Sequence, residues 1–452
     1  MNTLHGKSFF EVYKTSFIRS IPILIGVALF SYTTILKAYH TKGLGRNPVS
    51  KLVKADSNNA GLKLPVGFGA LLVADKMGPT RHIAVAPNGD IFLKLYDADN
   101  GPGIKVLHDA LGNGKPTLSQ SFGNYSGTGI AIKNGYLYAT SNNDIYRYKL
   151  DKDYKVIDPA NPEHIVYGLI ERGEHESKSI TLDNNGNIYV NIGAYSNACQ
   201  VKDRQKGSPA MDPCPILDSA GGIWKFKADV LNQTYKDGIH YGKGIRNTVG
   251  LDWNTETNQL FVMQHGRDQL HDLFPNLYGT KENAELPAEE MLQIEPGKFY
   301  GWPYCYYDEL QNKKVLSPEY GGDGKKVGRC ANAENPVIAF PGHMAPNGLL
   351  FYKGNQFPSR YKNGAFIAFH GSWNRAPEPQ KGYFVVFVPF EKGKPSGKWE
   401  IFADNFAGID LVKSPGQAKH RPCGLAEGPD GSLYVTDDHE GSVYRIIYNG
   451  KI

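Results

Sequence analysis

The sequence predicts an all-β fold, a six-bladed β-propeller with four-stranded antiparallel blades, preceded by an N-terminal hydrophobic helix. The main observation is one strand–turn–strand pattern that recurs six times along the 452 residues. Glycine is abundant, at 51 residues, and so are strand-forming aromatics, with 27 tyrosines and 21 phenylalanines. This composition favours many short strands joined by tight turns. Long helical patterns are absent from the body of the sequence.

The recurring unit is an apolar strand, a turn of Asn, Asp or Gly, and a second strand that begins with an aromatic or aliphatic residue. Asn-Gly and Asp-Gly supply the positive φ angles that tight hairpins need. Alternating β-branched and aromatic residues on both sides indicate strands. The six copies are HIAVAPNGDIFL at 82–93, GIAIKNGYLYAT at 129–140, SITLDNNGNIYVNIG at 179–193, VGLDWNTETNQLFVMQHG at 249–266, NGLLFYKGNQFPSRYKNGAFIAFHG at 347–371 and CGLAEGPDGSLYVTDD at 423–438.

Most copies are followed by a third apolar strand, which extends the hairpin into a meander of about four strands, as in a propeller blade. Longer insertions separate the later copies, chiefly residues 267–345, where ENAELPAEEML at 282–292 suggests one short helix. Because the loops at one end of a propeller converge, we expect functional residues there. The third strands are GIKVLH, DIYRYKL, GIWKFKA, YFVVFVPF and SVYRIIY.

The N-terminal region combines basic residues with an apolar run. Lys7, Lys14 and Arg19 precede the run from Ile21 to Leu36, a pattern typical of a signal peptide or a short membrane anchor. A small-x-small cleavage site does not follow, which favours a retained anchor and leaves cleavage open. We predict a signal-anchor segment and linker at 1–45, and a propeller domain at 46–452 that is exported to the periplasm or cell surface.

The five cysteines suit an oxidising compartment. Cys199 and Cys214 close a loop rich in Pro and Gly, and Cys305 and Cys330 bracket a second irregular stretch. Both pairs suit disulfides, although sequence alone leaves the pairing open, and buried reduced thiols are the alternative. The cysteines form no CxxC pair, which argues against a structural zinc site.

Charge and motif content exclude several functional classes. The formal net charge of +5 is too small to indicate nucleic acid binding. The sequence contains no GxGxxG, GxSxG or HExxH motif. Nicotinamide binding, a serine-hydrolase elbow and a zincin site are therefore not predicted.

Charged loops next to three repeats supply candidate functional residues. His175 precedes the third repeat in ERGEHESK and is a candidate general base. Arg246 and Asn247 precede the fourth, where a forked cation and an amide can bind a carboxylate or oxyanion. Lys419 and Arg421 precede the sixth and add cationic groups. A solvated surface loop is the alternative interpretation of each.

Three further segments carry possible site chemistry. Gly266, in MQHGRDQL, permits close backbone approach, and exposed carbonyls at such a point can bind calcium. The aromatic stretch IEPGKFYGWPYCYYD at 294–308 can wall a pocket for a flat ring or a sugar, or cap the core. The segment HGSWNRAPEPQKG at 370–382 clusters His370, Trp373, Asn374 and Arg375.

At least four of the six repeats thus place Arg, His, Asn or Lys in comparable loops. A purely structural propeller gains nothing from this repetition. A pocket for an anionic cofactor needs cations to neutralise carboxylates, and calcium can share that role. The residues alone therefore favour an anionic-cofactor site at the axial end.

Taken in order, these segments resemble the glucose/sorbosone dehydrogenase family of quinoproteins. The matching segments are RHIAVAPNGDIF, GIRNTVGLDW, MQHGRDQL, FYGWPYCYYD, NGAFIAFHGSWNR and RPCGLAEGPDGSLYVTDD, and the similarity spans roughly residues 62–449. It implies a six-bladed propeller with pyrroloquinoline quinone (PQQ) and Ca²⁺ at the axial mouth. It also implies oxidation of a sugar or sugar-derived aldehyde, with electrons passed to an external acceptor such as a cytochrome or quinone.

The resemblance implies a role for each candidate residue. His175 matches the base that removes the substrate O–H proton, with Arg246 beside it at the reacting carbonyl of the cofactor. The backbone carbonyls of Gly266 and Arg267 match the calcium ligands. Asn247, Lys419 and Arg421 match further cofactor contacts. From their clustering, rather than from the resemblance, we predict that His370, Trp373, Asn374 and Arg375 line the cofactor pocket.

One position departs from the family pattern. Soluble glucose dehydrogenases carry an Asp that orients the histidine, and Ala194 fills that position here. An imidazole without an orienting partner is a poorer base, unless Glu174 or Glu176 substitutes. Two alternatives stay open, a calcium-dependent propeller hydrolase of the lactonase type and a non-catalytic surface-binding propeller.

Overall fold

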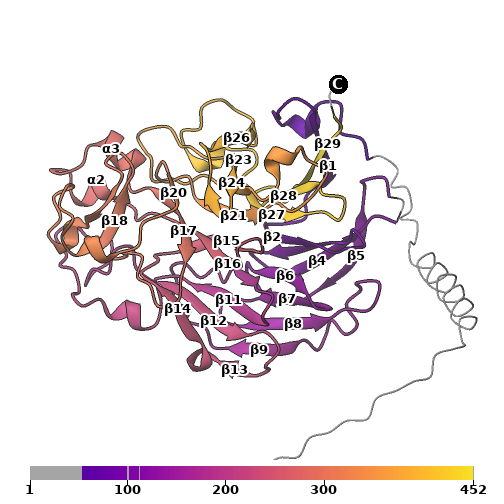
Figure 1. Cartoon of the computed structure of the whole chain (residues 1–452), viewed down its shortest axis with the longest axis horizontal. Coiled ribbons are helices and arrows are strands. Elements are labelled where there is room, and N and C mark those ends of the chain that lie inside the picture. Colours follow the sequence, from indigo (N-terminus) through magenta and orange to yellow (C-terminus); the bar gives the residue numbers. More distant parts are fainter. Residues whose placement is uncertain (1–52, 99–100, 111, 451–452) are drawn as a thin grey trace, which may run out of the picture. The chain divides into compact units, whose positions relative to one another are not determined.

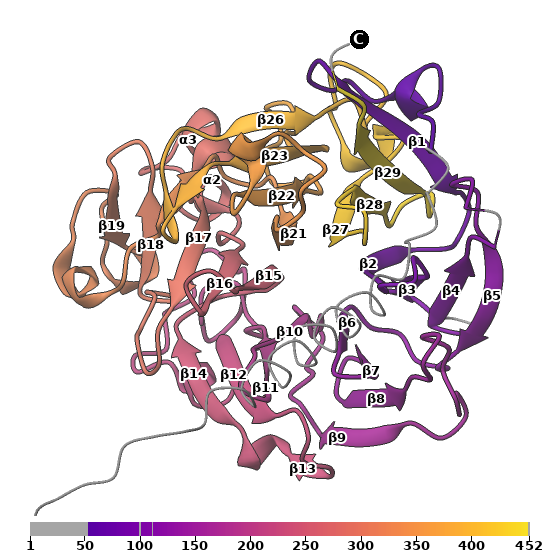
Figure 2. The same ribbon diagram turned by 45° about the vertical axis from the view of Figure 1, so that its right-hand side comes forward.

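The computed structural model describes residues 53–98, 101–110 and 112–450 and shows six antiparallel sheets around one axis. In Figure 2 the innermost strand of each sheet faces a shared centre. The predicted six-bladed propeller is confirmed, and each predicted repeat supplies the two inner strands of one blade. Residues 1–45, predicted as the anchor and linker with the hydrophobic helix, lie outside the described residues.

Five blades are built from strands that follow one another along the chain. The first blade comprises β2 (Thr80–Val85), β3 (Ile91–Leu95), β4 (Ile104–His108) and β5 (Thr117–Phe122). The second comprises β6 (Ile130–Lys133), β7 (Tyr136–Thr140), β8 (Ile145–Lys149) and β9 (Glu163–Tyr167). A short strand, β13 (Gln233–Thr234), pairs in parallel with β9. The third comprises β10 (Ile180–Leu182), β11 (Asn187–Ile192), β12 (Gly222–Lys227) and β14 (Ile239–Lys243). The fourth and fifth comprise β15 (Thr248–Asn254), β16 (Gln259–Gln264), β17 (Glu289–Ile294) and β20 (Ile338–Phe340), then β21 (Pro346–Phe351), β22 (Ala365–Phe369), β23 (Phe384–Val388) and β26 (Glu400–Ala403).

The sixth blade joins the two ends of the described chain. Strands β27 (Pro422–Glu427), β28 (Leu433–Asp437) and β29 (Val443–Tyr448) are completed by β1 (Phe68–Ala74), which pairs antiparallel with β29. Figure 2 shows β1 beside β29 at the outer edge of this blade. The pairing closes the ring and leaves no long free edge between its ends.

The Asn-Gly turns form the tight hairpins that the sequence predicts. In blade two, Asn134 and Gly135 have φ angles of 49° and 79°, and Lys133 pairs directly with Tyr136. Two successive residues with positive φ are typical of a type I′ turn, whose twist matches that of the flanking strands. This turn sets the register of the inner strands.

The 267–345 insertion forms a small subsidiary region beside blade four (Figure 1). It contains α2 (Leu270–Leu273), α3 (Thr280–Glu285) and the hairpin of β18 (Cys305–Asp308) and β19 (Lys313–Leu316). The predicted helix at 282–292 is right only in its first turn, since residues from Glu289 onward form β17. Pro287 explains the difference, because proline cannot continue the helix and disfavours helical backbone before it.

Short elements complete the chain. They are β24 (Phe390–Glu391), β25 (Lys394–Pro395) and the 3₁₀ turns Asn59–Gly61, Pro215–Asp218, Tyr235–Asp237, Pro318–Tyr320, Gly328–Asn332, Ser359–Tyr361 and Pro415–Gln417. No helix within the described residues is long and apolar enough to cross a membrane.

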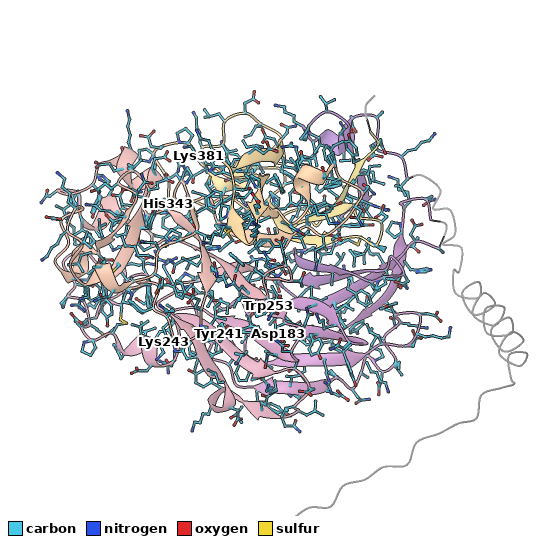
Figure 3. All side chains as sticks on the ribbon, viewed as in Figure 1. Asp183, Tyr241, Lys243, Trp253, His343 and Lys381 are labelled. Atoms are coloured by element: carbon cyan, nitrogen blue, oxygen red, sulfur yellow. A yellow bond between two sulfur atoms is a disulfide. The ribbon has the colours of Figure 1, made fainter. Side chains whose placement is uncertain are left out.

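Aromatic side chains fill the wedges between neighbouring blades. Between blades three and four, the Tyr189 ring lies 5.0 Å from that of Tyr241 and stacks at 5.1 Å on Trp253. In Figure 3 Tyr241 and Trp253 lie near Asp183, whose carboxylate accepts a hydrogen bond from the Tyr189 hydroxyl at 3.2 Å. This packing fixes the angle between the blades and so the position of the loops above them.

Both predicted cysteine pairs are disulfides. Cys199 bonds to Cys214 and Cys305 bonds to Cys330. Cys423 is a buried free thiol. Each disulfide anchors an irregular segment that regular sheet hydrogen bonds do not hold.

Candidate active site

The loops at one end of the ring gather the predicted residues into two walls. These loops precede the innermost strands β10, β15, β21 and β27 and follow the second strands β11, β16 and β22. We call His175, Arg246, Asn247 and Asp268 the base wall, and Arg81, His370, Arg421 and Asp438 the cationic wall. His265 connects them electrostatically, because the charges of Arg246, Asp268 and His370 all act on its pKa.

His175 is held in an unusual backbone conformation in the base wall. Its φ angle is +56°, which non-glycine residues adopt at a cost that the surrounding structure must support. Gly193 permits this approach, because a Cβ at Gly193 would lie 2.5 Å from the Cβ of His175. Residue 193 therefore has to be a glycine, because any side chain there would collide with His175 in its observed position.

The backbone carbonyl of Ala194 orients the His175 ring. It bonds to Nδ1, and a carbonyl can only accept, so Nδ1 carries the proton and Nε2 holds the lone pair. Within the described part of the chain Nε2 has no partner. Burial, followed by the positive charge of Arg246, holds the pKa of His175 well below its usual value. The imidazole is therefore neutral and available as a base at neutral pH.

This geometry revises the expectation raised by Ala194. Neither proposed substitute is the partner of His175, since the Glu174 carboxylate bonds to Arg204 and the Glu176 carboxylate accepts from Asn142 at 3.1 Å. The orienting group is instead the main chain of Ala194 itself. Sequence comparison of side chains has no signal for a backbone acceptor.

Arg246 forms the centre of the base wall. Its Nη2 donates to the Asp268 carboxylate at 2.8 Å and to the Asn197 side chain at 3.1 Å, and its Nη1 donates to the carbonyl of Gly266 at 3.1 Å. The guanidinium is almost fully buried, and burial lowers its pKa. Arg246 and the other nearby cations hold the pKa of Asp268 below its usual range. The ion pair is therefore intact at neutral pH.

Asn247 lies next to the base. Its Oδ1 accepts from the Asn191 side chain at 3.2 Å, and it would meet a Cβ at Gly193 at 2.9 Å. Among the described residues its Nδ2 has no partner. Asn247 therefore offers a donor on the same side as His175 and Arg246.

Gly266 begins the predicted metal loop. A Cβ there would lie 2.9 Å from the carbonyl oxygen of Pro287, so only glycine fits without a shift. Its N–H donates to Glu289 at 3.0 Å. The neighbouring Arg267 turns its side chain away into the insertion, where Nη1 contacts both oxygens of Glu319 at 2.5 Å.

Glu289 supports two loops of the site at once. Its buried carboxylate accepts from Gly266 N at 3.0 Å, Met344 N at 2.9 Å and Ala345 N at 3.0 Å. We expect Glu289→Gln to lower the free energy of unfolding by about 1–3 kcal/mol, because an amide replaces one acceptor oxygen with a donor. Chemical denaturation measures this change.

Glu427→Gln is the matched control for Glu289→Gln. The Glu427 carboxylate also accepts two backbone N–H groups, from Lys353 and Gly354, but the residue is partly exposed. Water can replace its lost acceptor, so we expect a smaller change. Equal losses in the two variants would contradict the supporting role of Glu289.

The cationic wall is a network of two arginines and one histidine around Asp438, and burial lowers the pKa of that histidine, His370. The Asp438 carboxylate lies 2.6 Å from His370 Nε2 and 2.8 Å from Arg81 Nε. Arg421 donates to the carbonyls of His370 at 3.2 Å and Gly371 at 2.6 Å. His370, Arg81 and Arg421 hold the pKa of Asp438 below its usual range, so the carboxylate fixes the wall without neutralising all of its positive charge.

The remaining predicted residues fall into two groups. Lys419 and Trp373 are exposed, with 51% of Trp373 accessible. Asn374 and Arg375 are buried: Asn374 Nδ2 lies 3.2 Å from the ring of His343, and Arg375 pairs with Glu285 at 2.5 Å.

Arg375, a predicted cofactor contact, lies beside the end of α3. All three guanidinium nitrogens bond to protein acceptors, namely Pro379 O, Ala284 O with Gly342 O, and Glu285. The side chain thus clamps the end of α3 to the 371–383 loop. Arg246 is held in the same way, since its Nε also donates to Asn197 O at 3.3 Å.

The aromatic stretch at 294–308 is mainly a packed wall. Trp302 is 4% exposed and donates its indole N–H to Asn197 O at 2.9 Å. Tyr306 is buried and its hydroxyl lies 2.9 Å from that of Tyr278. Trp302 therefore holds the same Asn197 that contacts Arg246.

Sequence patterns do not single out five residues of this arrangement. They come from elements far apart in the chain, and His343, for example, lies with the loops in the upper left of Figure 3. Their functional signal is the buried charge network that they form after folding. They are Arg81, Arg204, Glu289, His343 and Asp438.

The chain is similar in sequence to several known proteins. Over 408 residues the chain is 26% identical to an uncharacterised protein of Borreliella burgdorferi, covering 88% of this chain and 93% of that one. It is 29% identical over 235 residues to a "pyrroloquinoline quinone-dependent pyranose dehydrogenase" of Coprinopsis cinerea, covering 45% of this chain and 31% of that one. A "pyrroloquinoline quinone-dependent sugar dehydrogenase" of Hypocrea jecorina is 22% identical, covering 83% and 82%.

Solved structures share the fold. The holo form of the PQQ domain of the Coprinopsis cinerea pyranose dehydrogenase matches with a TM-score of 0.66 at 22% identity, covering 85% of this chain and 97% of that one. A calcium structure of a Trichoderma reesei enzyme of carbohydrate-active family AA12 matches with a TM-score of 0.68 at 19% identity, covering 86% and 97%. The predicted resemblance to quinoprotein sugar dehydrogenases is confirmed by the relatives and the family model together. The chain belongs to the TrAA12-like family, whose model matches residues 62–449.

Proposed function

We propose that this protein is a PQQ-dependent oxidoreductase that oxidises a sugar or a sugar-derived aldehyde and passes the electrons to an external acceptor. One observation carries the proposal: a neutral histidine with a free Nε2 lies beside a buried arginine at the mouth of a cation-lined propeller. Family membership and the names of the relatives support PQQ as the cofactor. The acceptor, a cytochrome or a quinone, and the substrate within this class are further proposals.

The residues at the site fit an anionic, flat cofactor. PQQ carries three carboxylates, and the cationic wall supplies Arg421 and Arg81, with Lys419 at the exposed rim. Asn247 supplies its unpartnered amide donor and Arg246 its guanidinium. These side chains would hold the carboxylates and the quinone edge by charge-assisted hydrogen bonds. When bound, PQQ supplies the electrophilic quinone carbon that accepts hydride.

The protein's own contribution to the reaction follows from His175. Its Nε2 would accept the proton of the substrate hydroxyl as the C–H bond loses hydride, since Nδ1 is already bonded to Ala194. Arg246 would stabilise the negative charge that develops on the cofactor oxygen. The buried side chains of Asn247 and Asp268 and the carbonyl of Ala194 keep both groups oriented before substrate arrives.

Calcium is the second proposed cofactor. The carbonyl of Gly266 accepts one hydrogen bond from Arg246, and its second lone pair remains for a cation, with the Arg267 carbonyl next to it. Calcium prefers such oxygen ligands, and when bound it acts as a Lewis acid on a cofactor oxygen. No group of three or more His, Cys, Asp or Glu side chains in the described part of the chain is placed to hold a metal, so backbone carbonyls are the ligands that we propose.

We also propose that the propeller is exported and tethered by residues 1–45. The two disulfides support export, because such bonds persist in oxidising compartments. Cell fractionation with a tag at the C-terminus tests this. Recovery of the protein in the reducing cytoplasm would contradict it.

The function is tested by adding PQQ and Ca²⁺ to the purified protein. We expect a bound-PQQ absorbance change, reduction of an artificial electron acceptor with aldoses or other aldehydes, and loss of both on treatment with a calcium chelator that added Ca²⁺ reverses. Calorimetry measures the affinity independently of turnover. Absence of PQQ binding would overturn the proposal, and metal-dependent lactone hydrolysis without PQQ would support the hydrolase alternative.

A further inference from the structure

A disulfide-closed loop places one cation, Arg204, between Glu174 and Asp268. The loop lies between β11 and β12, is closed by Cys199–Cys214, and is held further by the bridge between Gln200 and Ala210. Within the loop, the Asp203 carboxylate accepts a hydrogen bond from Ser196 Oγ at 2.5 Å. The next residue, Arg204, has a φ angle of +54°. The loop is thus an ordered support that presents Arg204.

Arg204 is bound on all sides by groups from two different loops. Its Nε lies 2.9 Å from Glu174 Oε1, and its Nη2 lies 3.0 Å from Asp268 Oδ2 and 3.4 Å from Glu174 Oε2. Its Nη1 donates to Gln269 Oε1 at 3.1 Å. A planar guanidinium can make these fixed contacts together, whereas a lysine ammonium cannot.

Both partners of Arg204 are neighbours of the proposed catalytic groups. Glu174 precedes His175 in the chain, and Asp268 Oδ2 is shared with Arg246, which it contacts at 2.8 Å. The side chain of Arg204 is 25% exposed against 4% for Arg246. Arg204 therefore holds the two loops together from the outside and faces no reacting atom directly.

The backbone of His175 needs such a tether. Its left-handed conformation persists only where neighbouring contacts fix it, and the two bonds of Glu174 to Arg204 are charge-assisted contacts of the residue directly before it. Without Arg204, Glu174 and Asp268 would face each other's negative charge across the site. The loop of His175 would then relax away from Arg246.

We propose that Arg204 is a positioning residue that sets the place and the protonation of His175, and that the Cys199–Cys214 bond acts on the site through it. The inference rests on the proposed function. Arg204→Gln is expected to lower kcat by about 10- to 100-fold, since a misplacement of about 1 Å has effects of that size. KM and PQQ affinity are expected to change by no more than about threefold, because Arg204 lies outside the groups that would hold substrate or cofactor.

A pH readout separates positioning from a merely structural role. The charged and titratable groups acting on His175 include Arg246, Asp268 and His265, with Glu174 adjacent in the chain. Removing the positive charge of Arg204 leaves the negative charges of Glu174 and Asp268 less compensated, and these charges favour the protonated form of His175. The pKa of His175 is therefore expected to rise, and the acidic limb of the pH profile of kcat/KM to move to higher pH. Arg204→Lys is expected to restore the acidic limb to its wild-type position, because the positive charge is kept. The kcat of this variant should stay reduced, because an ammonium group cannot make the forked contacts of a guanidinium.

The control is Arg329→Gln. Arg329 pairs with Asp212 of the same disulfide loop, but at the surface, with 45% and 43% of the two side chains exposed. The Arg329→Gln variant should leave kcat and the pH profile unchanged. Replacing both Cys199 and Cys214 by serine should reproduce the effect of Arg204→Gln on kcat.

A measurement without cofactor keeps this inference separate from the proposed function. In the protein free of PQQ, NMR titration of labelled histidines is expected to show the His175 imidazole protonating at higher pH in Arg204→Gln than in the wild type. Unchanged titration together with unchanged kcat would overturn the positioning role. If the wild type fails to bind PQQ while the titration shifts, the proposed function fails and the positioning role stands.

Discussion

Replacing His175 by alanine is expected to lower sugar turnover by about 10²–10⁴-fold, the usual contribution of a positioned general base. PQQ affinity should stay within a few-fold of the wild type, because Arg421, Arg81 and Asn247 remain. The expected loss is therefore in kcat, and PQQ absorbance measures binding separately. In the wild type the low pKa of His175 keeps the base unprotonated, so turnover should persist as the pH falls to about 6.5 and below.

His164→Ala is the matched control for this substitution. His164 is also partly buried and lies 3.6 Å from Asp144, but it belongs to the outer strand β9 of blade two. It should leave turnover unchanged. A His175→Ala protein that retains turnover with normal PQQ binding would show that another group removes the proton.

Replacing Arg267 by methionine is expected to lower the free energy of unfolding by about 3–5 kcal/mol, the cost of leaving one charge of a buried pair uncompensated. The partner is Glu319, and the two side chains are only 3% and 0% exposed. Arg267 directly follows the proposed metal-binding Gly266, so the affinity for Ca²⁺ is expected to fall as well. Denaturant unfolding and calcium titration measure the two effects.

Two comparisons test the explanation for Arg267. Lys298→Met breaks an exposed pair with Glu334, in which the two side chains are 49% and 44% exposed, and should cost much less stability than Arg267→Met, because water screens an exposed pair. The double variant Arg267→Met with Glu319→Leu should be more stable than Arg267→Met alone, since no charge remains buried. A double variant as unstable as the single one would indicate lost packing as the cause.

The sequence predicts the repeating part of this fold well. Each repeat carries its own turn and strand signals, and Asn134 and Gly135 adopt the positive φ angles that such a pair favours. Ring closure is different, because β1 carries no repeat and its partner β29 is almost at the other end of the chain. Local patterns contain no information about that pairing.

The candidate site, like the fold, is predicted only in part from the sequence. His175, Arg246, Asn247 and Arg421 are predicted from loops that precede inner strands, and the structure places them at one end of the ring. The orienting partner of His175 is a main-chain oxygen, which every residue possesses and no residue type reveals. Similarly, an arginine at position 375 predicts a hydrogen-bond donor. The tertiary packing determines that its N–H groups donate to the end of α3 and to neighbouring loops.

The sequence by itself determined the six-bladed propeller and the set of loops that carry the candidate chemistry, because these depend on short-range turn and strand preferences. Only the tertiary structure decided how the ring closes, which charges are paired and which remain available. Burial and distance set those outcomes, since Asp268 can pair with both Arg246 and Arg204 only after three separate loops meet.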